Sequence, residues 1–380
     1  MLEQFQLDTG IVDTLDLKTL LITWGIVYSE DIYNRFARTG RIAPPADCAA
    51  CNGIILPDGV AVHLTANSSS PFAVGVNERG TPCLLHKGAR LTDIAIPEPS
   101  AFYEQKTASG TPFGQCAVLQ GNGILSFYYL WPCQFARNNE GCHFCLQALG
   151  EMMGMTFPTP TPEEAGEIVA WAIANNCVGD VQITGGSRYS DTGECADVAA
   201  MIRGIDKISG IVNIPGEIYP YLSAPKQPEA LDEVFDAGAD RVAMDLNVWD
   251  ERIHAEVCPG HARHIGRPAQ LRALEYVVDK YGPNRACSAF VVGIEPLESL
   301  LAGAEYLGSK GIVPLMSLWL PGPRTVNGLD QAPGLDYYRR ARQGFAEIFS
   351  KYCLVPPGVT AGAHVCMCRD IYDHLDDIVR

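Results

Sequence analysis

The chain has 380 residues, 47% of them apolar, which is enough to bury one barrel-sized core with smaller additions. Its 28 Lys and Arg stand against 44 Asp and Glu, and the net charge of −16 argues against a surface that neutralises phosphates, so we expect no nucleic-acid partner. The chain starts without a basic segment or a cleavage site, and no apolar stretch reaches the roughly eighteen residues of a membrane span. We therefore expect a cytoplasmic protein with no membrane partner.

The first part of the chain, residues 1–115, is predicted to be a small mixed α/β lead-in domain. A helix is expected over residues 13–36, followed by Gly- and Pro-rich sequence with short apolar runs such as GVAVHLT and PFAVGV. Cys48 and Cys51 form a CxxC pair just ahead of these runs. Such a pair can supply two ligands to one metal.

Residues 116–325 alternate between apolar strand-like runs and amphipathic helices, a pattern typical of a parallel sheet covered by its helices. Six strands are expected, over residues 123–130, 179–185, 210–220, 240–247, 287–294 and 311–320. One intervening helix is expected to be capped by Thr161, and another has an apolar face of Leu271, Leu274, Val278 and Tyr281. The spacing between strands leaves room for a crossover helix each time, and we predict a partial, TIM-like (β/α)6 barrel.

Residues 326–380 are predicted to be a C-terminal extension. A helix is expected over residues 336–352, and a tail interrupted by Pro and Gly follows it. The tail holds Cys353, Cys366 and Cys368.

The stretch WPCQFARNNEGCHFC places Cys133, Cys142 and Cys145 in the loop directly after the first barrel strand. This is the carboxyl end of the sheet, where barrels of this kind assemble active sites. Clustered thiols in a reducing compartment indicate metal binding or catalysis, and three thiolates leave one position of a four-iron cluster open for a small molecule. Two alternatives stay open: some of these cysteines are core residues, or His143 or a distant cysteine completes a closed zinc site.

The cysteine loop, with Phe144 directly before its last cysteine and six β/α units around it, resembles the radical SAM superfamily over roughly residues 117–325. The resemblance implies that Cys133, Cys142 and Cys145 bind a [4Fe-4S] cluster, and that S-adenosylmethionine (SAM) binds the fourth iron. One electron then cleaves SAM to a 5′-deoxyadenosyl radical. The chain departs from the commonest form of the motif, because eight residues separate its first two cysteines.

Further segments resemble the SAM-binding motifs of that superfamily. The resemblance implies that the backbone of Gly185 and Gly186 in TGGS meets the methionyl amine, with Ser187 where the family often has an acidic residue. It also makes the polar residues Glu217, Asp245 and Asn247, expected at the ends of the third and fourth strands, candidates for the ribose and methionyl carboxylate. The alternative for each is an ordinary turn or a solvated strand end.

The run that begins with EVCPGH at residues 256–261 resembles the lipoyl synthase and biotin synthase branch, which favours cofactor biosynthesis. Its VVGIEPLES segment resembles the fifth-strand motif that packs on adenine. Val292, Gly293 and Leu318 would then contact the adenine, although apolar strand ends are otherwise simply core.

The resemblance implies a small-molecule or peptide-borne substrate at the barrel mouth and an electron donor such as flavodoxin or ferredoxin. No residue is assigned a catalytic role, and no motif identifies the substrate. A second cluster or a zinc ion could be bound by thiols outside the loop, which are otherwise free cysteines: Cys48, Cys51, Cys353, Cys366 and Cys368. The rival functions are a zinc-stabilised binding or scaffold protein and a zinc hydrolase on the same barrel.

Overall fold

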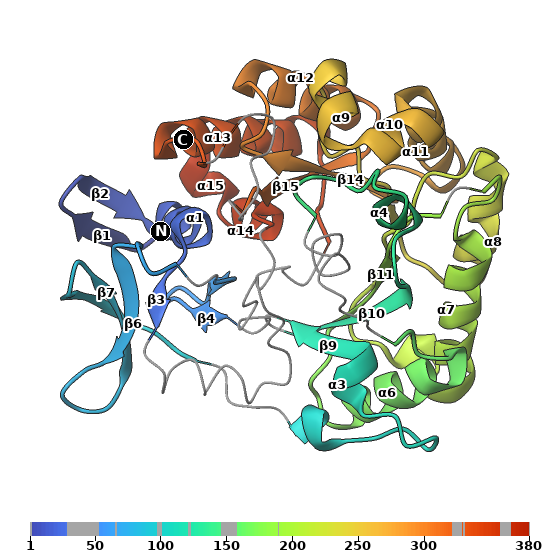
Figure 1. The fold of residues 1–380 in the computed structure, drawn as a ribbon, viewed down its shortest axis with the longest axis horizontal. Coiled ribbons are helices and arrows are strands. Elements are labelled where there is room, and N and C mark those ends of the chain that lie inside the picture. Colours follow the sequence, from blue (N-terminus) through green and yellow to red (C-terminus); the bar gives the residue numbers. More distant parts are fainter. Residues whose placement is uncertain are drawn as a thin grey trace.

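A computed structural model describes residues 2–28, 53–64, 67–96, 101–120, 123–145, 158–188, 190–320, 329, 331–357 and 366–379. Its N-terminal part consists of short strands and one helix (Figure 1). A hairpin of β1 (Gln4–Leu7) and β2 (Gly10–Asp13) leads into α1 (Thr14–Trp24). A sheet follows in the order β3 (Val27–Tyr28), β6 (Phe72–Val76), β7 (Pro82–His86) and β8 (Ala89–Asp93), and β4 (Ile54–Ile55) pairs with β5 (Ala61–Val62).

Helix α1 is shorter than the helix predicted over residues 13–36. It begins at a capping box in which the side chains of Asp13 and Asp16 each accept a hydrogen bond from the other's backbone N–H. It ends at Trp24 because Gly25 adopts a φ of 66°, outside the helical range. Residues 29–36 of the predicted helix lie outside the described residues.

Six parallel strands then follow in sequence order, which confirms the predicted partial (β/α)6 barrel. They are β10 (Ile124–Leu130), β11 (Asp180–Gly185), β12 (Ile218–Pro220), β13 (Val242–Ala243), β14 (Ala286–Val292) and β15 (Val313–Leu318). β10 to β12 pair in order, as do β13 to β15, and a parallel bridge between Tyr221 and Ala243 joins the two halves. Antiparallel β9 (Ala117–Gln120) pairs with the free edge of β10, so within the described chain the barrel is open between β10 and β15.

The crossover helices lie outside this array of strands (Figure 1). They are α6 (Pro162–Ala174), α7 (Cys195–Ser209), α8 (Leu231–Asp236), α9 (Glu251–Val257), α10 (Pro259–His264), α11 (Arg267–Tyr281) and α12 (Leu297–Ser309). Helix α6 is capped by Thr161, as predicted, in a capping box with Glu164 and with Pro162 at the first position. Because the six strands are parallel, all six carboxyl ends face the same edge of the barrel.

Shorter helical segments occupy the connections. They are the 3-10 turns η1 (Ala101–Glu104), η2 (Ile211–Asn213) and η3 (Pro228–Ala230), and the helices α3 (Phe113–Cys116) and α4 (Gln134–Arg137). The turn η2 occupies part of the predicted third strand, which is regular only over β12. The predicted fourth strand is likewise reduced to the two residues of β13.

The C-terminal extension packs on the barrel and on α1. Helix α13 (Leu335–Tyr352), predicted to within one residue, contacts α12, and α14 (Cys368–Asp373) and α15 (Leu375–Ile378) complete the extension. The Lys18 ammonium of α1 is fully buried and lies 2.6 Å from the Asp370 carboxylate of α14. A buried lysine is tolerated only with such a partner, so the pair fixes α1 against the extension.

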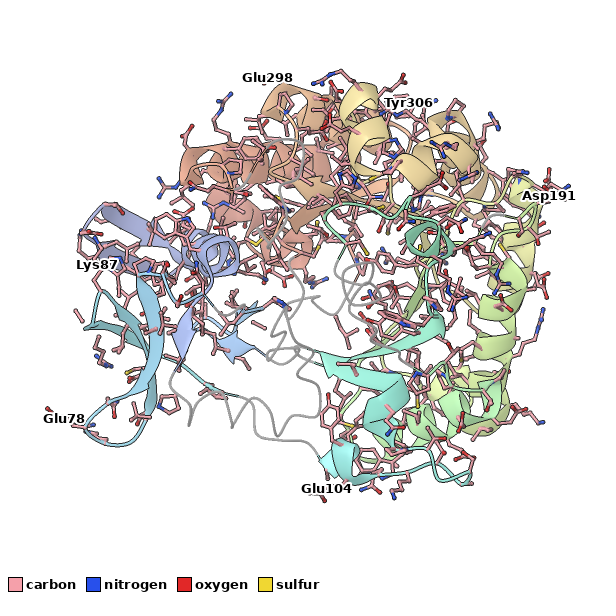
Figure 2. All side chains as sticks on the ribbon, in the orientation of Figure 1. Glu78, Lys87, Glu104, Asp191, Glu298 and Tyr306 are labelled. Carbon is pink, nitrogen blue, oxygen red and sulfur yellow. The ribbon has the colours of Figure 1, made fainter. Side chains whose placement is uncertain are left out.

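Acidic side chains are spread over the exterior, in keeping with the net charge of −16. Figure 2 shows Glu78, Glu104, Asp191 and Glu298 on separate parts of the surface, and all four are exposed. None of the helices within the described ranges is long and apolar enough to cross a membrane.

Candidate functional site

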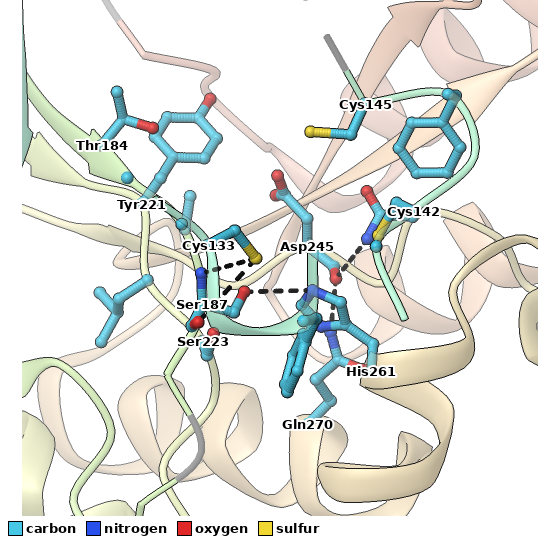
Figure 3. Close-up of a pocket in the computed structure, with 18 of the residues that line it drawn as sticks. Cys133, Cys142, Cys145, Thr184, Ser187, Tyr221, Ser223, Asp245, His261 and Gln270 are labelled. Atoms are coloured by element: carbon cyan, nitrogen blue, oxygen red, sulfur yellow. Dashed lines mark hydrogen bonds between the residues drawn. The ribbon is translucent and has the colours of Figure 1, made fainter. Parts of the chain in front are cut away.

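A pocket of about 290 Å³ lies at the carboxyl ends of β10 to β13 (Figure 3). Its walls include most of the residues predicted for the site. These are Cys133, Cys142, Phe144, Cys145, Gly185, Gly186, Ser187, Asp245 and Asn247. The structure therefore brings together segments that are more than a hundred residues apart in the sequence.

All three cysteines of the loop line this pocket (Figure 3). Cys133 is the N-cap residue of α4, directly after β10. Cys142 and Cys145 follow on a short turn, where the backbone N–H of Cys145 donates to the Cys142 carbonyl at 3.2 Å. Each of the three is partly exposed. The thiols are thus within reach of a ligand that occupies the pocket.

Burial changes the acidity of these thiols. It raises the pKa of Cys133, although hydrogen bonds from the backbone of Ser187 and neighbouring residues oppose this. The pKa of Cys142 is raised well above its ordinary value, first by a hydrogen bond with Cys258 and then by burial. Without a metal, both thiols therefore stay protonated at neutral pH. Metal binding releases these protons because the ligand is the thiolate.

The turn after β11 is in contact with the cysteine loop. A Cβ atom on Gly186 would lie 2.7 Å from the Cβ atom of Cys133, and one on Gly185 would lie 3.0 Å from the backbone of Leu130. The backbone N–H of Gly186 donates to the Leu130 carbonyl at 2.9 Å. Glycine is needed at residue 186 because the two loops approach too closely for a side chain.

Asp245 is a half-buried acidic residue on the pocket wall, just beyond the end of β13. Burial raises its pKa to about 6, against one hydrogen bond that Oδ1 accepts from the backbone N–H of Ala289 at 2.9 Å. Asn247, two residues on, has a positive φ of 64° and donates from its side chain to the Asp245 carbonyl at 3.1 Å. Both side chains can offer oxygen acceptors to a polar ligand.

Four predicted site residues do not line the pocket. The predicted position of Glu217 at the end of the third strand is wrong, because β12 begins after it and its carboxylate pairs with Arg241. Tyr221 and Ser223 reach the pocket from the end of this strand instead. The remaining three lie at or directly after the ends of β14 and β15 but outside the pocket: Val292, Gly293 and Leu318.

Three pocket residues that the sequence analysis missed carry buried polar atoms. These atoms are Ser223 Oγ, His261 Nδ1 and Gln270 Oε1, and none of them has a hydrogen-bond partner among the described residues. A buried polar atom without a partner is costly, so the three are suited to pair with a polar ligand. His261 could have been found from the sequence, because it belongs to the EVCPGH motif. Gln270 could not, because it lies inside a helix and belongs to no motif.

Glu194 was also missed, and it supports the pocket from behind. Its fully buried carboxylate accepts hydrogen bonds from the backbone N–H groups of Arg188 and Ser223. Burial raises its pKa to about 7, in opposition to these bonds. Glu194 therefore connects the loops that follow β11 and β12.

The thiols predicted for a second metal site do not all come together, although the side chains of Cys366 and Cys368 interact with each other. Cys353 is exposed after α13, whereas Cys366 lies beside β15 and the Cys368 sulfur accepts a hydrogen bond from the Met316 N–H at 2.8 Å. Cys48 and Cys51 lie outside the described residues. In the ranges that the structure covers, no group of three or more His, Cys, Asp or Glu side chains converges as ligands of one metal ion.

The donor set of the pocket fits an iron–sulfur cluster. Three thiols line a cavity with space beside them, and soft thiolates are the ligands of such clusters. Residues 137–300, which include Cys142 and Cys145, match the family model of the radical SAM superfamily. The chain therefore carries a radical SAM domain over these residues, and the cofactors that this family implies are SAM and an iron–sulfur cluster.

A curated relative is the bacteriochlorophyllide c C-7(1)-hydroxylase of Chlorobaculum limnaeum. It is 24% identical over 284 residues, which cover 70% of this chain and 69% of the relative. Among solved structures, SuiB of Streptococcus suis bound to SAM is 14% identical with a TM-score of 0.44, over 60% of this chain and 48% of that one. The coproporphyrinogen III oxidase HemN of Escherichia coli is 13% identical with a TM-score of 0.40, over 61% and 53%. The chain thus spans about half the length of these two structures, and its own strand order defines the barrel.

Proposed function

We propose that Cys133, Cys142 and Cys145 hold a [4Fe-4S] cluster and that SAM occupies the rest of the pocket. The observation that carries the proposal is the convergence of these three thiols with the Gly185–Gly186 turn on one cavity. Bound there, the cluster supplies the electron that cleaves SAM to a 5′-deoxyadenosyl radical. This pocket lies at the carboxyl ends of the strands, where other barrels of this kind also have their active sites.

The chain's own residues bind and orient SAM. The backbone of Gly185 and Gly186 offers polar groups without a side chain in the way. Asp245 and Asn247 offer acceptors to hydroxyl or amino groups. The unpaired Ser223 Oγ and Gln270 Oε1 gain partners when a polar ligand enters. A ligand that fills the pocket would displace water from the strand ends, which would protect a reactive species from side reactions.

The proposed substrate is a small molecule that loses hydrogen from an unreactive carbon. The support is the similarity to the bacteriochlorophyllide hydroxylase, so hydroxylation is the outcome we propose first. The proposed electron donor is a small redox protein such as flavodoxin or ferredoxin. Residues 116–325 would carry the catalysis, with residues 1–115 and 326–380 as separate additions.

The experiment is an anaerobic assay of the reconstituted, dithionite-reduced protein with SAM, with and without candidate small molecules. We expect 5′-deoxyadenosine to form slowly alone and faster with a substrate. Oxygen from labelled water in the product would support hydroxylation. A product that gains sulfur or a methyl group instead would exclude it, while an absence of 5′-deoxyadenosine would contradict the whole proposal.

A further inference from the structure

The segment between the first two cysteines of the loop packs on α10. Eight residues, 134–141, separate these cysteines, and the segment begins with α4. The Phe135 ring of α4 is almost completely buried, with its centroid 5.1 Å from that of His261 and 5.5 Å from that of His264, which stacks on it. A Cβ atom on Gly260 would lie 2.7 Å from the Cβ atom of Phe135, so glycine is needed where the helix meets the loop. The eight-residue segment is therefore docked on a helix.

Backbone hydrogen bonds fix the chain on both sides of Cys142. The Gly260 N–H donates to the carbonyl of Glu140, two residues before this cysteine, at 3.0 Å. The N–H of His143, directly after the cysteine, donates to the Val257 carbonyl at 2.9 Å. Both partners lie at the junction of α9 and α10. The position of Cys142 thus depends on this junction.

The Glu140 side chain forms a second attachment to α10. Its carboxylate accepts a hydrogen bond from the Arg263 guanidinium, and its Oε2 lies 2.7 Å from His264 Nε2. The Glu140 side chain is only 13% exposed, whereas that of Arg263 is 67% exposed. An ion pair between two exposed side chains contributes little to stability, but a largely buried carboxylate is destabilising without its partners. Glu140 is therefore held at α10 by groups that it needs.

The charged groups of this network act on the pocket only from outside. Glu140, Arg263 and His264 do not line the pocket, whereas the neighbouring Gly141 and Cys142 do. The three side chains are therefore not placed to bind a ligand in the pocket themselves. Any effect on such a ligand has to pass through the chain at residues 141 and 142.

We infer that Glu140, paired with Arg263 and His264, is a positioning residue that holds Cys142 ready to bind the iron–sulfur cluster. A gap of eight residues would by itself let the second cysteine take many positions relative to the first, and ordering such a segment costs conformational entropy. The anchor on α10 orders the segment in advance, so cluster binding does not have to do so. This inference rests on the proposed function, since it takes Cys142 as a cluster ligand.

The first measurement is hydrogen exchange of the metal-free protein, resolved by peptide. In Glu140→Ala, we expect the peptides that contain His143 and Gly260 to exchange about tenfold faster than in the wild type, because local opening becomes easier. Glu140→Gln retains a side-chain oxygen acceptor and should stay close to the wild type. Glu256→Ala, which removes an exposed carboxylate on α9, is the matched control and should leave the exchange unchanged.

The second measurement is the loss of iron from the reconstituted protein to a chelator. Glu140→Ala should lose iron about tenfold faster than the wild type, since the loop that carries Cys142 opens more often. His264→Phe retains a ring that stacks on Phe135 and removes Nε2, so it should shift in the same direction. Combining both changes should add little to either one, because the two residues act through one contact.

Wild-type rates of exchange and iron loss in folded Glu140→Ala would overturn the inference. A change in only one of the two rates would also overturn it, as would faster exchange that extends to barrel strands such as β14, because the effect would then not be local. Thermal unfolding checks the fold, and if Glu140→Ala does not fold, Arg263→Ala, changed at an exposed side chain, decides by the same two measurements. A failure of the proposed function is distinguishable, because the wild type itself would then bind no iron whatever the exchange results.

Discussion

The backbone N–H of Ser187 lies 3.3 Å from the sulfur of Cys133 and donates a hydrogen bond to it. In return, the N–H of the residue after Cys133 donates to the Ser187 carbonyl at 2.9 Å. The turn after β11, proposed to bind SAM, and the loop after β10, proposed to bind the cluster, are therefore one structural unit. A change in either loop is expected to affect both ligands.

Gly186→Ala is expected to lower both iron content and SAM affinity. The new methyl group would meet the backbone and Cβ of Cys133, and such overpacking costs about 1–3 kcal/mol. Iron analysis and calorimetric titration with SAM measure the two effects. Gly334→Ala is the matched control, because that position has a φ of −65° and open space around it. Equal iron and SAM binding in the two variants would contradict the close contact.

Ser223→Ala is expected to weaken SAM binding without lowering the stability of the protein alone. Its hydroxyl is buried without a partner of good hydrogen-bond geometry in the described chain, so its removal should cost the free protein little. If SAM is the partner, about 0.5–1.5 kcal/mol of binding energy is lost. Ser126→Ala is the control, since its hydroxyl already donates to Gln182 at 2.7 Å and its loss should reduce stability. Thermal unfolding and SAM titration measure the two effects. Lower stability with unchanged SAM affinity in Ser223→Ala would show that Ser223 does not contact the ligand.

Glu194→Gln is expected to destabilise the protein and reduce the pH dependence of its stability. Burial raises the Glu194 pKa from 4.5 to about 7, so between these pH values the native state binds more protons than the unfolded state. The free energy of unfolding therefore falls as pH rises through this range, by up to roughly 3 kcal/mol. Glutamine cannot accept hydrogen bonds at both positions that the carboxylate oxygens occupy. Denaturant unfolding of both proteins from pH 4.5 to 7 measures the difference, and parallel curves would contradict the assignment.

Asp245→Asn is expected to remove a pH dependence of SAM binding. The raised pKa of Asp245, about 6, means that the carboxylate forms as pH rises through this value. An ionised carboxylate accepts stronger hydrogen bonds from ligand hydroxyls, so wild-type affinity should increase from pH 5 to about 7. SAM titration at several pH values tests this. If the SAM affinity of the variant changes with pH as that of the wild type does, Asp245 does not contact SAM.

The sequence predicted the barrel because its apolar runs and helical faces recur with regular spacing, and the cysteine loop because three thiols lie close together along the chain. It misplaced Glu217, since apolar residues continue on both sides of a strand that is regular over only three residues. It missed Glu194 and Gln270 because their roles come from contacts between distant segments. A buried carboxylate that accepts two backbone N–H groups leaves no local pattern in the sequence.

The ligand set is the central claim, and iron and sulfide content of anaerobically reconstituted cysteine variants tests it most directly. Cys133→Ala, Cys142→Ala and Cys145→Ala should each lose the visible absorption of the cluster and the cleavage of SAM. Cys353→Ala, changed at an exposed thiol after α13, should retain the wild-type content of about four irons per chain. Full iron and SAM cleavage in any of the first three variants would contradict the account.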